Sequence, residues 1–125
     1  MALVPLLIAS AVYLVIEGLW LWFALPRVYT PVFKRIQGGK DVSYTPWWGL
    51  IAYPILCLGM WYLVVLHSRS RTELNVKSLM FSASVYGIYN LTMLACFEEY
   101  GVGTALIDTL WGVVAIGVFS NIAFR

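Results

Sequence analysis

Four long apolar stretches run through this chain, and they leave little choice of fold. They cover approximately residues 2–25, 47–66, 78–97 and 104–124. Each is close to the roughly 20 residues that a helix needs to cross the hydrocarbon core of a bilayer. Because backbone groups in lipid must be hydrogen-bonded within the chain, stretches of this kind fold as helices. We therefore expect an all-α membrane protein, a four-transmembrane-helix bundle forming a single transmembrane domain over residues 1–125.

The composition supports a membrane location. Hydrophobic residues make up 62% of the 125 residues and charged residues only 11%, whereas a soluble chain has about 25% charged residues. So small a body cannot bury this much apolar surface, so the remainder is expected to face the lipid bilayer. The net charge of +2 offers no basic surface for nucleic acid.

The first apolar stretch is interpreted as a retained helix and not as a cleavable signal peptide. No Lys or Arg precedes it, the apolar run is too long, and Glu17 lies inside it. These features differ from those of a signal peptide, which has a basic start and a short apolar region. The protein is thus expected to be an integral, multi-pass membrane protein.

The connection over residues 26–46 contains a candidate short helix. Thr30 and Pro31 suggest an N-cap followed by proline at the first helical position, and Gly38 and Gly39 suggest its end. Between them, apolar and basic residues fall on opposite faces, as in a helix that lies in the membrane interface. An irregular basic loop is the alternative.

The orientation in the membrane does not follow from the charges. We call side B the membrane surface that holds Arg27 and Glu98. Lys and Arg residues divide evenly between side B and the opposite surface, so the positive-inside rule returns a tie. The acidic residues of side B favour, weakly, an N-terminus inside the cell.

Polar residues of all four spans fall at one depth. At about 1.5 Å per residue they lie roughly 6–12 Å below side B. This embedded polar layer comprises Glu17, Tyr53, Tyr89, Asn90, Thr92 and Asp108. A carboxylate in hydrocarbon is costly and normally faces the bundle interior or a wet cavity. No Lys or Arg of the spans lies at this depth, so the expected partners of Glu17 and Asp108 are the other polar residues, the indoles or a neighbouring subunit.

Three interpretations of this layer stay open. It could be an ion or proton site or a small polar pocket, in which case it would carry binding or transport. It could equally be an interhelical hydrogen-bond network that fixes packing, as polar residues in membranes often do. In the third interpretation, Asp108 lies near enough to side B to be wetted by solvent.

Catalytic and metal sites are not expected. Cys57 and Cys96 lie in apolar stretches without the spacing of metal ligands, and His67 lies in a connection. No nucleophile–base pair, metal-ligand set or cofactor motif is visible. We therefore expect no enzyme activity, no metal and no cofactor.

The third and fourth spans carry a recognisable pattern. The runs Tyr86-Gly-Ile-Tyr-Asn-Leu-Thr92 and Ile107-Asp-Thr-Leu-Trp-Gly112 resemble an uncharacterised family of small four-helix membrane proteins, a domain of unknown function with members in bacteria and large DNA viruses. The resemblance extends to Glu17 before a Leu-Trp pair and to Tyr53 in the second span. Its most specific element is the motif of Asp108, Trp111 and Gly112.

The chain departs from this family at two positions of the third span. Asn90 stands where the family usually has Asp, and Met93 where it usually has Asn. Glu17 and Asp108 are therefore the embedded acids. The resemblance implies an architecture and a motif but no activity.

Two functions follow from these expectations. The first is a structural or assembly subunit of a cellular or virion membrane, which packs against copies of itself or other membrane proteins. The second is an oligomeric transporter or channel for ions, protons or small solutes, which uses the layer of Glu17 and Asp108. Four helices give thin walls for a pathway, so the second function needs an oligomer.

Overall fold

The computed structural model describes residues 3–125, which form helices joined by short connections and contain no strand. The segments, with π-helical ones marked η, are in chain order α1 (Leu3–Ala24), η1 (Leu25–Tyr29), α2 (Thr30–Ile36), α3 (Pro46–Gly59), η2 (Met60–Val65), α4 (Arg71–Ser82), η3 (Ala83–Gly87), α5 (Ile88–Cys96) and α6 (Val102–Ala123). Within these residues, four rods are long and apolar enough to cross a membrane: Leu3–Ile36, Pro46–Val65, Arg71–Cys96 and Val102–Ala123. The expected all-α fold with four membrane-spanning helices is confirmed.

The first rod is longer than expected because α1 continues through η1 into α2. The short helix after Thr30 exists, but the cap assigned to Thr30 is wrong. Thr30 has helical backbone angles, and its N–H bonds to the carbonyl of Leu25. No side chain caps α2, whose preceding residue Tyr29 is also helical. The segment is therefore the last part of the first span.

Two prolines explain the shape of this rod. Pro26 and Pro31 lie in the first turns of η1 and α2. Proline lacks an N–H and its ring crowds the carbonyl four residues earlier, and a wider π-helical turn relieves this crowding without ending the helix. The rod of 34 residues is about 50 Å long, which exceeds the roughly 30 Å hydrocarbon core. Its last turn, with Lys34 and Arg35, can therefore reach the headgroups.

The first rod ends before Gly38 and Gly39, as the sequence predicts. Gly38 and Gly39 have positive φ angles of 68° and 89°, a conformation that glycine adopts without strain. The N–H of Gly39 bonds to the carbonyl of Lys34 at 2.9 Å, which satisfies a carbonyl that the helix end leaves free.

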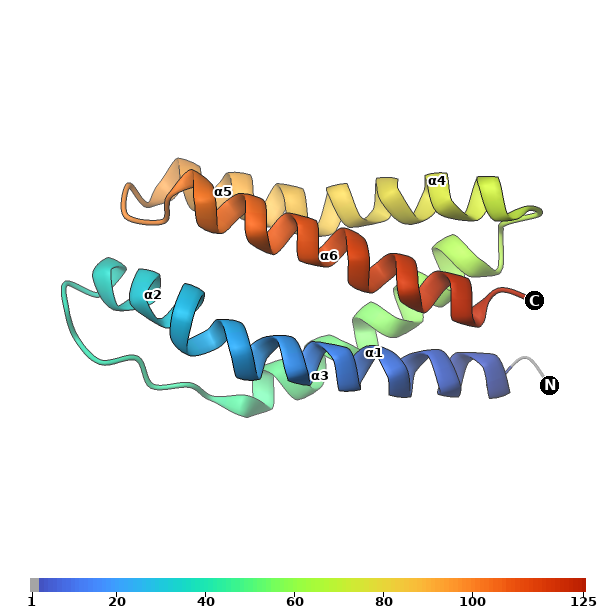
Figure 1. Cartoon of the computed structure of the whole chain (residues 1–125), viewed down its shortest axis with the longest axis horizontal. Coiled ribbons are helices and arrows are strands. Elements are labelled where there is room, and N and C mark those ends of the chain that lie inside the picture. Colours follow the sequence, from blue (N-terminus) through green and yellow to red (C-terminus); the bar gives the residue numbers. More distant parts are fainter. Residues whose placement is uncertain (1–2) are drawn as a thin grey trace.

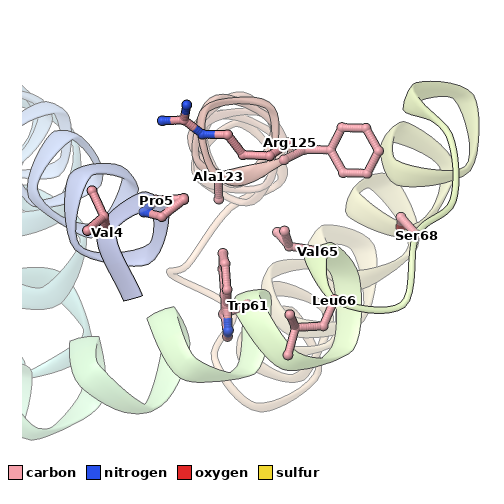
Figure 2. Close-up of a pocket in the computed structure, with 9 residues that line it drawn as sticks. Val4, Pro5, Trp61, Val65, Leu66, Ser68, Ala123 and Arg125 are labelled. Atoms are coloured by element: carbon pink, nitrogen blue, oxygen red, sulfur yellow. The ribbon is translucent and has the colours of Figure 1, made fainter. Parts of the chain in front are cut away.

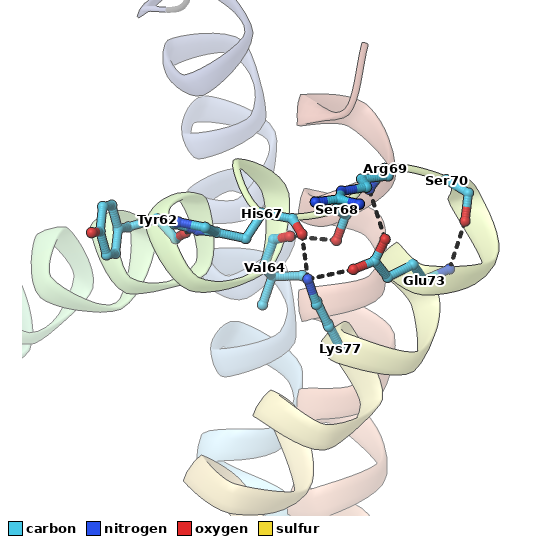
Figure 3. Close-up of polar contacts among 8 residues, drawn as sticks. All are labelled: Tyr62, Val64, His67, Ser68, Arg69, Ser70, Glu73 and Lys77. Atoms are coloured by element: carbon cyan, nitrogen blue, oxygen red, sulfur yellow. Dashed lines mark hydrogen bonds and ion pairs between the residues drawn. The ribbon is translucent and has the colours of Figure 1, made fainter.

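The third rod begins at Arg71, earlier than the apolar pattern indicated. Ser70 caps it by accepting a hydrogen bond from the N–H of Glu73 at 3.1 Å. The Glu73 carboxylate in turn accepts from the N–H of Arg69 at 2.9 Å and pairs with Lys77 at 2.7 Å (Figure 3). This Ser-x-x-Glu arrangement resembles a capping box. Its polar residues form a helical start that hydropathy alone does not detect.

The two termini lie at the same end of the bundle, where α1 and α6 converge (Figure 1). The larger core cluster contains Tyr13, Met60, Leu74, Ile116 and Phe119, which are all fully buried. It joins α1, η2, α4 and α6 in the half of the bundle away from side B. A smaller cluster at side B contains residues of α2, α6 and the turn between α5 and α6. The embedded carboxylates lie between these two packed regions.

A cavity of about 630 Å³ opens at the end of the bundle near the termini (Figure 2). Val4 and Pro5 of α1, Trp61 of η2 and Ala123 of α6 form much of its wall. It contains no acidic side chain and lies away from side B. It is therefore separate from the embedded polar layer.

Candidate functional site

Glu17 is held inside the bundle by two neutral donors. It lies on α1 with its side chain buried. The indole Nε1 of Trp111 on α6 donates to Oε2 at 2.7 Å, and the phenol of Tyr53 on α3 donates to Oε1 at 3.3 Å. The carboxylate thus joins three separate spans.

Asp108 has a matching pair of neutral donors. It is half-buried on α6. The phenol of Tyr29 in η1 donates to Oδ1 at 2.6 Å, and the amide Nδ2 of Asn90 on α5 donates to Oδ2 at 2.7 Å. Short bonds of this kind are typical where the acceptor is ionised.

Asn90 extends the network toward side B. Its side chain is 2% exposed, and its Oδ1 accepts from the phenol of Tyr100 at 2.5 Å. Tyr100 lies in the turn between α5 and α6. Burial, together with the nearby charge of Asp108, raises the pKa of Tyr100, so this phenol stays protonated and donates. Every polar atom of the Asn90 amide therefore has a partner.

A stacked pair of indoles links the two carboxylates. The rings of Trp20 and Trp111 lie 4.7 Å apart with an interplanar angle of 8°. Trp111 donates to Glu17, while Trp20 donates to the Tyr29 oxygen at 3.1 Å. Tyr29 is itself the donor to Asp108. The two acids are therefore parts of one continuous arrangement.

Among the residues that the structure describes, neither carboxylate has a cationic partner. Within residues 3–125, the ion pairs are Lys34 with Asp41 and Lys77 with Glu73, and both are remote from the site. A carboxylate has about four acceptor positions on its two oxygens, and each oxygen here accepts one hydrogen bond from a side chain. Both acids keep acceptor capacity that a proton or a cation could use.

Glu17 and Asp108 also line two adjoining cavities. The larger has a volume of about 980 Å³ and lies between α3 with η2 on one side and η3 with α5 on the other. The smaller, of about 170 Å³, lies toward side B beside Tyr29 and Tyr100. Tyr89 lines both cavities as well, and its side chain is 49% exposed. The embedded acids therefore face open space as well as their donors.

The sequence as a whole is similar to one known protein family. Residues 2–125 match the family described as "Predicted membrane protein (DUF2177)". The chain belongs to this family. The match covers nearly the whole chain and confirms the resemblance to an uncharacterised family of membrane proteins. No match is found among the curated proteins or the solved structures.

The motif expected from the family resemblance lies at the centre of the site. Asp108 accepts hydrogen bonds from Tyr29 and Asn90, and Trp111 donates one to Glu17. Gly112 lets the helices approach, because a Cβ added there would overlap the ring of Tyr86. Tyr86 in turn bonds through its hydroxyl to Tyr13 at 3.0 Å.

The structure brings most, but not all, of the expected layer together. Glu17, Tyr53, Asn90 and Asp108 share the network, and Tyr89 lies on the cavity walls. Thr92 is not part of the site, because its hydroxyl is exposed and donates to the carbonyl of Ile88 at 2.7 Å. Residues two apart on a helix point in different directions, so Asn90 and Thr92 share a depth but not a face.

Sequence reasoning missed Trp20, Tyr29 and Tyr100. One signal was available: Glu17-Gly-Leu-Trp20 and Asp108-Thr-Leu-Trp111 have the same acid-x-Leu-Trp pattern. Their helices, α1 and α6, run antiparallel (Figure 1). The repeated spacing thus places the two indoles against each other. Tyr29 had no such signal, since its position depends on the π-helical turn.

Proposed function

We propose that this protein binds protons or small cations at Glu17 and Asp108 and moves them across the membrane. One observation supports this most directly: both embedded acids line the same cavities while all their side-chain partners are neutral. Embedded acids commonly mark ion pathways and proton relays. This proposal favours the second of the two functions considered from the sequence.

The arrangement of donors suits reversible binding. Trp111, Tyr53, Tyr29 and Asn90 stabilise the ionised acids from the protein side. The cavities leave the opposite side of each carboxylate free for a proton or a cation. Because the two acids are linked through the stacked indoles, a charge change at one is expected to alter the hydrogen bonds of the other.

The test is flux into proteoliposomes, measured for protons and for common monovalent cations. We expect flux in the wild type and a loss of flux in Glu17→Gln and Asp108→Asn, which keep the shape of each side chain. Glu73→Gln is the matched control, because Glu73 is an acid outside the site. Circular dichroism and size-exclusion chromatography establish that each variant folds. An absence of wild-type flux across pH and cations would reject transport.

A structural or assembly role is the second candidate, and a different observation favours it. The network ties all four spans together, since its members come from α1, η1, α3, α5 and α6. Interhelical hydrogen bonds of this kind stabilise membrane bundles. In this role, the protein would assemble with copies of itself or with other membrane proteins, and a place in a virion membrane stays a prediction.

The double variant Glu17→Gln, Asp108→Asn separates the two roles. A transport role predicts that it folds and assembles while flux is lost. A purely structural role predicts no flux in either protein and a lower unfolding temperature for the variant. Chemical crosslinking in membranes would show whether either form is an oligomer.

We propose no enzyme activity. His67 lies in the connection between η2 and α4, at the end of the bundle away from side B. Its Nδ1 lies 2.5 Å from the carbonyl of Tyr62 (Figure 3). The position of His67 away from Glu17 and Asp108 supports this proposal.

A further inference from the structure

We propose that the larger cavity binds an organic cation with an apolar body, which enters from the lipid. This inference rests on the proposed cation-binding function and names the class of ligand. It is carried by the size of the cavity, by its lining and by the place where it opens.

The size of the cavity exceeds the need of a bare ion. Its volume of about 980 Å³ corresponds to the upper part of the range for small-molecule pockets, about 300–1,000 Å³. A single water occupies only about 30 Å³. Gly49, Ala52 and Gly59 are small residues on the α3 wall, and they leave this space open.

The lining is apolar on its sides and acidic at its inner end. Ile55, Leu63 and Val85 belong to the side walls, while Glu17 and Asp108 are its acidic residues. Among the described lining residues there is no Lys, Arg or His. A site with an apolar wall and convergent carboxylates is complementary to a cation that carries hydrocarbon groups.

Aromatic rings add to this complementarity. Tyr53, Phe81, Tyr86 and Tyr89 all line the cavity. The faces of aromatic rings attract cations, most strongly where water is excluded. An alkylammonium or phosphonium group could therefore interact with rings and carboxylates together.

The cavity is bordered by exposed apolar side chains of a membrane-crossing rod. Ile55 and Leu63 are 66% and 56% exposed, and both lie in the second membrane-crossing rod. In Figure 1, α3 runs obliquely to the other helices, and its continuation η2 packs against α4 and α6. The beginning of α3 is thus free of close packing with α5. A ligand dissolved in the bilayer can reach the carboxylates through this side.

The test uses two probes of the same shape and opposite charge. Tetraphenylphosphonium and tetraphenylborate both dissolve in bilayers, so protein in zwitterionic nanodiscs is compared with empty nanodiscs. We expect binding of the phosphonium that depends on the protein and no corresponding binding of the borate. Glu17→Gln and Asp108→Asn are each expected to weaken phosphonium binding roughly tenfold or more, because a buried charge partner is lost.

A second pair of variants keeps the test valid if the acid variants fail to fold. Ala52→Phe fills the cavity, whereas Leu50→Phe adds bulk on the same helix at a position that is 61% exposed and outside the cavity. We expect the first to abolish phosphonium binding and the second to preserve it.

The outcomes distinguish this inference from the proposed function. Equal binding of both probes would overturn it, since the cavity would then be a groove for any apolar molecule, such as a lipid chain. A lack of phosphonium binding with retained Glu17-dependent proton flux would reject the ligand class and keep the function. Phosphonium binding that depends on Glu17, without any flux, would support the ligand class and reject transport.

Discussion

The chemistry of the site depends on neutral hydrogen-bond donors that surround Glu17 and Asp108. Glu17 and Asp108 are stabilised by indole, phenol and amide groups, so their charge is solvated by the protein without being cancelled. A Lys or Arg in the same place would occupy each carboxylate permanently. The neutral donors leave both acids able to respond to a proton or a cation.

Gly112 is the residue whose change should affect this site most through packing. Its Cβ in Gly112→Ala would overlap the ring of Tyr86, which must move and strain its bond to Tyr13. We expect a loss of about 1–3 kcal/mol of stability, measured by unfolding in denaturing detergent. Gly117→Ala is the matched control, since nothing lies within 4 Å of the added Cβ and alanine favours helix. Equal effects of the two changes would contradict this.

At the scale of the helices, the termini of the rods follow local capping rules and the bends follow proline. Pro26 and Pro31 lie in the first turns of η1 and α2, where the helix continues without a break. The rod ends at Gly38. The start of α4 is set by Ser70 and Glu73. These features give the first and third spans lengths that hydropathy alone misjudges.

The cap at Ser70 should contribute measurably to the third rod. Ser70→Ala removes the acceptor for the N–H of Glu73, so we expect a loss of about 1 kcal/mol. Ser84→Ala is the control, because Ser84 is exposed and only bonds back to the carbonyl of Met80. Thermal unfolding followed by circular dichroism measures both. The prediction fails if Ser84→Ala costs as much as Ser70→Ala.

Sequence reasoning predicted the elements better than the site. The spans, Glu17 and Asp108 could be found because charge is rare in apolar stretches. Thr92 shares the depth of Asn90 but not its contacts, because depth along a helix says nothing about direction around it. Tyr29 and Tyr100 were missed because a wide turn and a short connection bring them to the acids, and neither has a residue pattern of its own.

At the scale of the whole molecule, the larger core and the cavities lined by the acids lie in different parts of the bundle. The larger core lies toward the termini, where a separate cavity of about 630 Å³ opens, and the cavities lined by Glu17 and Asp108 lie between this core and the smaller cluster at side B. Under the proposed function, the larger core would stay packed while the cavities beside the acids exchange ligands. Under the same proposal, the oblique α3 would govern access from the lipid.

The spans also fix which parts share a membrane surface. Residues 3 and 125 lie at one end of the bundle, and residues 38–45 lie at the other (Figure 1). In sealed vesicles, we expect added protease to cleave the tags at both termini or neither of them. A tag within residues 38–45 should show the opposite behaviour. Protection of one terminus but not the other would contradict the fold, and the result also assigns the orientation.

The π-helical turn at η1 has a consequence for chain length. A π-helical turn holds an extra residue, so side chains on its two sides are rotated by about 100° relative to an unbroken α-helix. Tyr29 faces Asp108 only while that extra residue is retained. Deleting one residue from 26–28 should therefore separate the acid from its donor, even though no side chain of the site has changed. The connection over residues 38–45 has no such register and should tolerate the same deletion.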